Sequence, residues 1–458
     1  MKFHKSIFSK VVILLIVLGS MTIFYWYGYP KEFDEKCLPQ NTDGIVMVDV
    51  KNIRNYFIFS CLKNPSLCPF FSKEKKKENT LFNFSDFGIV TPNYLAFFQL
   101  ENQPISQWHI ALNIENGTLF ETAIIKANFS KEKLKNGMYF YYSKTVGLSI
   151  IKHTNQILVS KMTEKQKGIA INTANTLFVK KLFLDNKKIS NTIDTPNAIT
   201  IWIKKNSFLE EDGIVNITLE GQKIIAEGQL KLDSKYKKQT RFSQNTDALM
   251  SLGFDFGMIQ NQKIITGNSD KINKIMGFNI DSILAYKPSK TELFIYPMME
   301  KKDSAISYDY DDDFNLVKKI TVHTNREPSF YFSIQSKNSQ KVYNYLKTQK
   351  TIDNHSVFLN FPLATTKAYV KNNTLAFEAN PSKQSILKAS EPKIGYLLLN
   401  FKKLESKDWK SIIGKNKNFE LLKSFENFEI NLKQENNIGH FQAELTTKKG
   451  KDLVTILK

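Results

Sequence analysis

Short segments in which apolar and polar residues alternate recur along most of the chain. The clearest is Trp108–Leu112, in which every second residue is large and apolar. A period of two is typical of a strand with one covered face. Most such segments follow one another as consecutive hairpins do, with helix-like segments such as Thr118–Lys126 between some of them. The pattern predicts an α+β fold of mostly antiparallel sheet with packed helices.

The order of these elements occurs twice. The sequence Gln-Asn-Thr-Asp of Gln40–Asp43 returns at Gln244–Asp247, and each copy leads into an apolar strand. We therefore predict two tandem related units, residues 40–240 and 241–458, each with roughly seven or eight strands and two or three helices. The matching segments, first copy against second, are Gly44–Val50 and Ala248–Phe254, Tyr94–Leu100 and Glu292–Met298, Trp108–Ile114 and Phe330–Ile334, Thr118–Lys126 and Ser339–Lys347, Met138–Tyr142 and Ser356–Asn360, Gly147–Ile151 and Thr366–Val370, Gln156–Val159 and Thr374–Phe377, Glu164–Leu184 and the shorter Ser382–Lys388, Ala198–Ile203 and Gly395–Phe401, and the hairpins Ile214–Leu230 and Phe428–Leu445.

A different pattern opens the chain, where Val11–Tyr29 carries no charged side chain and follows three lysines within residues 1–10. A helix of this length spans roughly 28 Å, close to the hydrocarbon thickness of a bilayer. With the positive charge on its N-terminal side, the pattern predicts a cytoplasmic N-terminus at 1–10, a transmembrane signal anchor at 11–29 and a linker at 30–39. The bulk is then extracytoplasmic, on the periplasmic or extracellular face. A signal peptide cleaved near Gly19 is the alternative, and both interpretations export the protein.

Charge changes this picture little. The net charge is +20, but almost all basic residues are lysine, with arginine only at Arg54, Arg241 and Arg326. Bidentate recognition of phosphate or guanine favours arginine, so we expect no nucleic-acid partner. Attraction to anionic lipid headgroups or to an acidic envelope polymer stays open.

Three cysteines, Cys37, Cys61 and Cys68, lie in the N-terminal part of the chain. Cys61 and Cys68 flank a turn, and in an oxidising compartment they are either bonded to each other or two buried thiols. They belong to an insertion, with the charged run Lys73–Glu78, that the second copy lacks. No histidine stands near them, so we expect neither a metal nor a cofactor.

Catalytic signatures such as Gly-x-Ser-x-Gly, His-Glu-x-x-His and the phosphate-binding loop do not occur. The acidic run Asp309–Asp313 fails the calcium-loop pattern, because Phe314 and Ile320 stand where that loop needs glycine and glutamate. Its flanks are strand-like, which predicts the exposed tip of a hairpin. The exported histidines have no metal-ligand spacing; they are His109, His153, His323, His355 and His440.

Aromatic residues cluster in three predicted strands, at Phe97-Phe98, Tyr139–Tyr142 and Phe330–Phe332. Core packing and cross-strand pairing account for such clusters. The sharper alternative is an apolar groove for a lipid or an extended peptide, which requires a sheet face that is left uncovered.

The turn Leu38–Asp43, which runs into the strand Ile45–Val50, resembles the start of the mature part in families of uncharacterised exported bacterial proteins with a membrane or lipid anchor. The resemblance covers most of the exported region and implies no activity and no site residues.

These patterns favour a non-enzymatic protein of the cell envelope that binds or scaffolds other exported proteins. A carrier or chaperone, which shields acyl chains or unfolded segments in an apolar sheet groove, is the alternative. An envelope hydrolase is a third hypothesis and requires His, Asp and Ser or Cys in one pocket. The predicted linker reaches at most about 35 Å, which would hold the first unit near the membrane.

Overall fold

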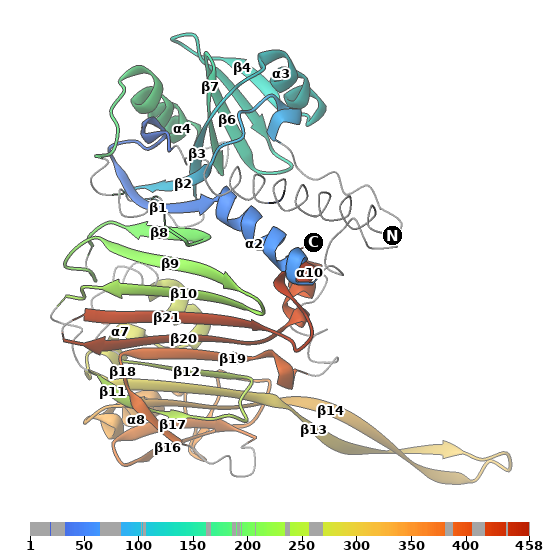
Figure 1. Cartoon of the computed structure of the whole chain (residues 1–458). Helices are drawn as coiled ribbons and strands as arrows, with labels where there is room; N and C mark the ends of the chain where they lie inside the picture. The colour runs from blue at the N-terminus through green and yellow to red at the C-terminus, as the bar shows by residue number, and fades with distance from the viewer. Residues whose placement is uncertain are drawn as a thin grey trace, which may run out of the picture. The chain divides into compact units, whose positions relative to one another are not determined.

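The computed structural model divides the chain into two compact units (Figure 1), the first made of Met1–Asn52 and Lys76–Pro196 and the second of Ile53–Lys75 and Asn197–Lys458. Each unit is described by itself. The structure describes residues 19, 33–64, 84–101, 103, 107–161, 166–185, 189, 193, 195–206, 208–233, 239–255, 269–380, 388–404, 417–436 and 438–457.

The first unit contains an antiparallel sheet in the order β1-β2-β3-β7-β6-β5-β4. Helix α3 packs Phe120 and Ile124 onto Tyr141 and Ile157 of this sheet. Asn116 caps the helix, because its side chain accepts bonds from the first free backbone N–H groups. The elements are η1 (Glu35–Cys37), β1 (Thr42–Asp49), η3 (Phe84–Phe87), β2 (Tyr94–Leu100), β3 (His109–Asn113), α3 (Gly117–Lys126), β4 (Ser130–Lys133), β5 (Tyr139–Ser143), β6 (Leu148–His153), β7 (Gln156–Lys161), α4 (Lys167–Ala174) and η5 (Asn175–Val179); helix α2 (Val50–Lys63) begins in this unit and continues in the second.

The second unit contains a longer antiparallel sheet in the order β8-β9-β10-β21-β20-β19-β12-β13-β14-β17-β16-β15. Strands β11 and β18 form a separate pair. The strands are β8 (Ile199–Ile203), β9 (Gly213–Glu220), β10 (Lys223–Leu230), β11 (Thr240–Gln244), β12 (Met250–Asp255), β13 (Lys290–Tyr310), β14 (Leu316–Gln335), β15 (Val357–Phe358), β16 (Thr366–Lys371), β17 (Thr374–Ala379), β18 (Lys388–Lys393), β19 (Gly395–Asn400), β20 (Phe425–Glu435) and β21 (Ile438–Thr447). The helices are α6 (Ser269–Met276), α7 (Ile280–Leu284), α8 (Ser339–Thr348), η10 (Phe401–Lys403), η11 (Lys417–Ser424) and α10 (Leu453–Leu457).

Strand pairing follows the same order in two places. The order β1-β2-β3-β7-β6-β5 of the first unit has its equivalent in β12-β13-β14-β17-β16-β15 of the second, and α3 and α8 follow β3 and β14 respectively. In the second unit, β8-β9-β10 and β19-β20-β21 are meanders that meet where β10 pairs with β21. The repeat boundaries 40–240 and 241–458 stay a prediction, and the compact units divide the chain elsewhere because both meanders belong to the second unit.

The predicted fold class, α+β with packed helices, was wrong. Of the residues that the structure describes, 48% lie in strands and 22% in helices. Among the described residues, nineteen strands pair in antiparallel sheet. The predicted helices at Thr118–Lys126, Ser339–Lys347 and, in part, Glu164–Leu184 are present as α3, α8 and α4 with η5. The described helices join or cover hairpins and form no layer of their own, so the sheet dominates the fold.

The membrane anchor predicted at Val11–Tyr29 lies outside the described residues, except for Gly19. Among the helices that the structure does describe, none combines the length and the apolar character needed to cross a bilayer.

Gly253 of β12 lies beneath two buried rings. A Cβ atom at this position would lie 2.5 Å from Tyr396 Cε1 and 2.7 Å from Phe242 Cδ1, which is closer than carbon atoms approach without rearrangement. We predict that Gly253→Ala destabilises the second unit by about 1–3 kcal/mol through overpacking. Amide hydrogen exchange of β12 measures this effect. Gly168→Ala is the control, because a Cβ atom at position 168 meets nothing within 4 Å; equal protection of β12 in both variants would contradict the prediction.

Candidate apolar binding site

One face of the second unit's sheet carries large apolar side chains on three adjacent strands. The register pairs Leu293 of β13 with Phe332 of β14, and Phe332 with Phe377 of β17. Two residues along, Ile295 faces Phe330. Paired residues of antiparallel strands share a face, so these five side chains form one apolar surface.

Helices cover only one end of this face. Helix α8 packs Val342 and Leu346 near Ile334 and Leu375, and α7 contributes Ile283 to the same cluster. Near Phe330, the loop between β15 and β16 lies over the face in place of the helices. The cavity described next lies where the helices end and the loop begins.

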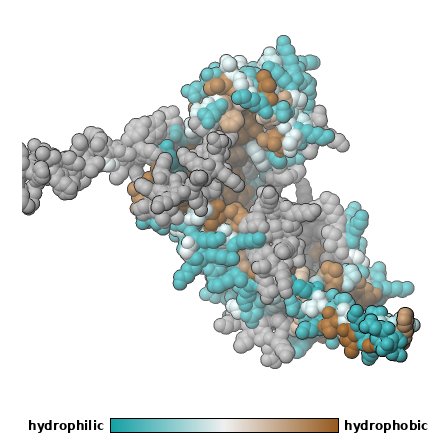
Figure 2. Space-filling view, turned by 90° about the vertical axis from the view of Figure 1, so that its right-hand side faces the viewer, coloured by the Kyte–Doolittle hydropathy of each residue, from teal (hydrophilic) through white to brown (hydrophobic). Residues whose placement is uncertain are grey.

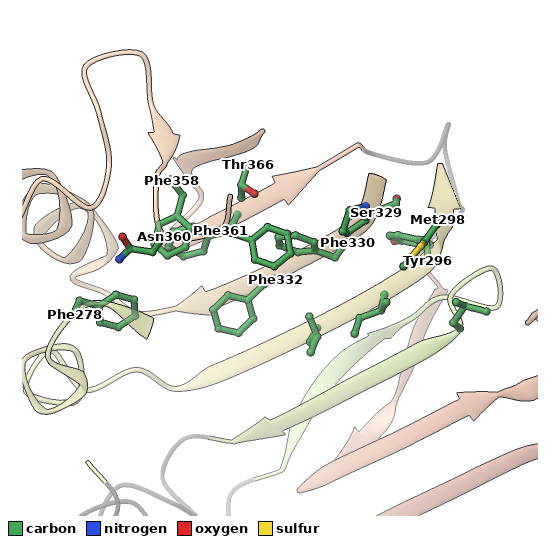
Figure 3. A pocket seen from close by; sticks show the side chains of 15 residues that line it. Phe278, Tyr296, Met298, Ser329, Phe330, Phe332, Phe358, Asn360, Phe361 and Thr366 are labelled. Atoms are coloured by element: carbon green, nitrogen blue, oxygen red, sulfur yellow. The ribbon is translucent and has the colours of Figure 1, made fainter. Parts of the chain in front are cut away.

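Strand β15 and the β15–β16 loop each place one more ring over the face. The ring of Phe361 stands edge-on to that of Phe330, with centroids 4.9 Å apart, and Phe358 meets Phe377 in the same manner at 5.0 Å. Phe278, which follows α6, closes another side (Figure 3). Such edge-to-face pairs are the geometry that aromatic quadrupoles favour.

Between these side chains lies a cavity of about 640 Å³. Six of its lining residues are phenylalanine, and no lining residue that the structure describes is charged. Protein pockets for small ligands commonly enclose about 300–1,000 Å³ and are mainly apolar. The lining residues are Leu249, Phe278, Leu293, Ile295, Tyr296, Met298, Pro328, Ser329, Phe330, Phe332, Phe358, Asn360, Phe361, Thr366 and Phe377.

The polar groups of the lining are bonded within the protein. Ser329 donates its hydroxyl to the Asn380 carbonyl at 2.6 Å, and Thr366 donates to the Ala364 carbonyl at 3.1 Å. The Tyr296 hydroxyl accepts a bond of 2.7 Å from Asn245 Nδ2. With these groups satisfied, the cavity selects a ligand by shape and apolar character.

Two parts of the site are partly exposed. Ile295 lines the cavity and keeps 37% of its surface exposed, although it belongs to a central strand. On the covering loop, Leu359 and Leu363 are 52% and 67% exposed on either side of Phe361. An apolar loop with two exposed leucines therefore forms one wall of the cavity, whereas the floor is hydrogen-bonded sheet.

The aromatic run Phe330–Phe332, singled out in the sequence, divides between two faces. Phe330 and Phe332 line the cavity, while Tyr331 points to the opposite face and stacks on Phe294 at 6.0 Å. The sequence did not identify Phe278, Phe358 or Phe361. The pattern that could have pointed to Phe358 and Phe361 is the mostly apolar segment Phe358–Ala364, in which apolar and polar residues do not alternate.

The other two aromatic clusters lie in the core of the first unit, as core packing predicts. Phe98 is 1% exposed and stacks on His109, and Phe97 stands edge-on to Trp108 at 5.2 Å. Tyr141 is buried and donates a 2.7 Å bond to Glu121. Burial opposes ionisation of Glu121, but its bonds from Lys152, Tyr141 and Lys131 prevail and lower its pKa to about 2.

His109 is a core residue of the first unit. Its Nε2 donates to Gln103 Oε1 at 3.1 Å, because that oxygen can only accept, and its Nδ1 then accepts from the Ser160 hydroxyl at 2.7 Å. The ring is fully buried, and this desolvation lowers its pKa to about 4. A neutral ring without solvent access has a structural role.

The remaining predicted site residues are not brought together. Among described residues, no group of three or more His, Cys, Asp and Glu side chains has metal-binding geometry. Asp309–Asp313 spans the tip of the β13–β14 hairpin, which confirms the predicted exposed turn. Burial raises the pKa of the Cys37 thiol to about 12, which removes its nucleophilic character. Cys61 lies half-buried on α2, but Cys68 lies outside the described residues, so their disulfide stays a prediction.

Comparison with known proteins gives no family for this chain, because no family model and no curated protein matches it. Three solved crystal forms of TP0453 (forms III, IV and I) are each 9% identical to it, with TM-scores of 0.26, 0.28 and 0.23. They cover 44%, 45% and 74% of this chain and 81%, 83% and 88% of that protein. Scores of this size carry no argument about fold or function.

The buried His109 makes the stability of the first unit depend on pH. Its pKa is about 4 in the folded protein and 6.5 when unperturbed, so between these values the unfolded chain binds the proton more tightly. Its stabilising contribution is therefore complete above pH 6.5 and is lost, by roughly 3 kcal/mol, as the pH falls to 4. Denaturant unfolding of the wild type and of His109→Gln across this range measures it. A stability difference that does not change with pH would contradict the assignment.

Proposed function

We propose that this protein is a non-enzymatic binding protein of the cell envelope that takes the acyl chain of a lipid into the cavity of its second unit. The observation that carries the proposal is an uncharged cavity of about 640 Å³ with six phenylalanine side chains in its lining. An apolar cavity of about 150 Å³ already binds benzene, so this space suits a considerably larger apolar group. Of the two non-enzymatic roles predicted from the sequence, the cavity favours the carrier.

An acyl chain fits this site better than an unfolded peptide does. A peptide brings an N–H and a C=O group for every residue, and each costs free energy when it is buried without a hydrogen bond. The lining offers few polar groups, and Ser329 and Thr366 are already bonded to backbone carbonyls. A methylene chain makes no such demand.

The headgroup of the bound lipid stays in water at the exposed edge, near Ile295. No charged side chain among the lining residues would hold a headgroup inside. The chain as a whole carries a net charge of +20, which attracts anionic lipids more strongly than zwitterionic ones. The predicted export of the protein is consistent with a lipid ligand.

Native mass spectrometry of the full chain, purified from cells, tests the proposal directly. We expect a population with an added mass, and lipid extraction should identify the addition as a fatty acid or phospholipid. A single unliganded mass, together with no uptake of a fluorescent fatty acid, would overturn the proposal.

Ile295→Lys places a charge at the edge of the cavity. We predict that the affinity for a fluorescent fatty acid falls at least tenfold, because the lysine side chain must either enter the cavity or occupy its mouth. Ile438→Lys is the matched control, since Ile438 is also 37% exposed in a strand of the same unit but does not line the cavity. Equal loss of binding in both variants would show that the cavity is not the site.

Phe361→Ala tests the loop as one wall of the cavity. Removing the ring abolishes its edge-to-face contact with Phe330, which is worth about 1 kcal/mol, so we predict roughly fivefold faster release of the fatty acid. Leu359→Ala is the control on the same loop, because its side chain is 52% exposed and outside the lining. Stopped-flow displacement measures both rates, and unchanged release from Phe361→Ala would show that the ligand does not pass this wall.

A further inference from the structure

The longest hairpin of the second unit extends beyond its neighbouring strands. Strand β12 pairs with β13 only as far as Ile295, and β17 pairs with β14 only from Phe330 onward. Residues 299–327, called the arm below, therefore pair only with each other in the part of the chain that the structure describes (Figure 1). Residues 299–325 are all exposed.

The arm has one apolar face. Its register pairs Ile306 with Ile320 and Tyr310 with Leu316. Along both strands, residues of this face alternate with residues of the polar face. Large apolar side chains on this face are 55–65% exposed; they are Ile306, Tyr308, Tyr310, Leu316, Ile320 and Val322. Lys318, which pairs with Tyr308, lies on the same face. Figure 2 looks toward the tip of the arm, near the bottom of the view, where hydrophobic and hydrophilic surface lie side by side.

The opposite face is polar and largely satisfied by its own cross-strand contacts. Asn325 donates to Asp303 at 3.0 Å, and the Ser307 hydroxyl donates to the Lys319 carbonyl. The Lys319 ammonium lies 3.9 Å from Asp309. The two faces therefore differ in kind: both are exposed, but only the apolar one would gain from a cover. A two-stranded hairpin is at best marginally stable in water, so an arm of this length gains most from burial of that face.

The tip of the arm is shaped for contact. Asp311 accepts backbone bonds from Asn315 at 2.7 Å and from Asp313 at 3.1 Å, which hold the loop closed. Phe314 has a φ of 60°, a conformation that bulky residues rarely adopt, and its ring is 85% exposed. A strained backbone that presents an aromatic ring to solvent indicates a binding role.

Charge is distributed unequally along the arm. The base is balanced, with Lys301, Lys302 and Arg326 against Glu300, Asp303 and Glu327; Lys301 bonds Glu327 at 3.1 Å, and Lys302 shares the apolar face. The tip carries the adjacent carboxylates of Asp311, Asp312 and Asp313. When two arms lie antiparallel, the acidic tip of each reaches Lys302 on the apolar face of the other. An anionic bilayer would instead repel three carboxylates at the leading end.

We propose that the arm is an interaction surface for a second copy of this chain, in which the two apolar faces cover each other about a twofold axis. Such an interface is self-complementary, since the same apolar residues meet at its centre and, at both ends, the acidic tip of one copy meets Lys302 of the other. In this arrangement the outer edges of both arm strands stay unpaired. The inference is independent of the lipid cavity, because no arm residue lines that cavity.

Sedimentation velocity of the purified full chain tests this proposal. We expect a concentration-dependent dimer whose dissociation constant rises at least tenfold in Ile320→Glu, because the glutamate lies in the centre of the apolar face. Thr321→Glu is the matched control on the adjacent residue of the polar face and leaves dimerisation unchanged. Circular dichroism confirms that both variants keep their strand content.

Charge exchange tests the orientation. Lys302→Asp and Asp312→Lys are each expected to weaken dimerisation several-fold, and the double variant to restore it, because the pair then re-forms with reversed signs. Failure of the double variant to recover affinity would overturn the antiparallel arrangement.

Three further outcomes would overturn the proposal. The first is a wild-type chain that stays monomeric at all concentrations. The second is a dimer that Ile320→Glu and Thr321→Glu weaken equally. The third is that the wild type floats with phosphatidylcholine–phosphatidylglycerol vesicles and that Ile320→Glu abolishes flotation but leaves the dimer unchanged. That result would assign the apolar face to a membrane.

Discussion

The antiparallel register between β13 and β14 determines which side chains share a face over the whole of the longest hairpin. Near its base the register brings Ile295 to Phe330 and Leu293 to Phe332, and farther out it brings Ile306 to Ile320. A slip of one residue would move each of these side chains to the opposite face. The cavity floor and the apolar face of the arm both depend on this pairing.

The two parts of the hairpin differ in what packs over their apolar face. At the base, helices α7 and α8 and the β15–β16 loop lie over the apolar face, and the incomplete fit between helices and loop leaves the cavity. The arm has no such cover among the described residues. The same alternation thus yields a closed core, a cavity and an exposed apolar surface, according to what packs against it. This gradation underlies both proposals, a lipid site at the base and a contact between copies along the arm.

Much of the local structure was predictable. Period-two alternation identified most strands, including β3 with its buried Ile110, and the acidic run Asp309–Asp313 was correctly placed at a hairpin tip. The fold class was not predictable from the same evidence, because short apolar segments are compatible with a helix or with a buried strand.

For the candidate site, the sequence by itself determined that Phe330 and Phe332 point to one side of a strand and Tyr331 to the other, because neighbouring side chains in a strand alternate. It also determined the charge and the absence of known catalytic motifs, and it predicted two related units. Only the tertiary structure decided that Phe278, Phe361 and Phe377, far apart in the chain, surround one cavity. Likewise it decided that His109 meets Ser160. Long-range contacts of this kind depend on strand order and on the packing of loops, which local alternation does not specify.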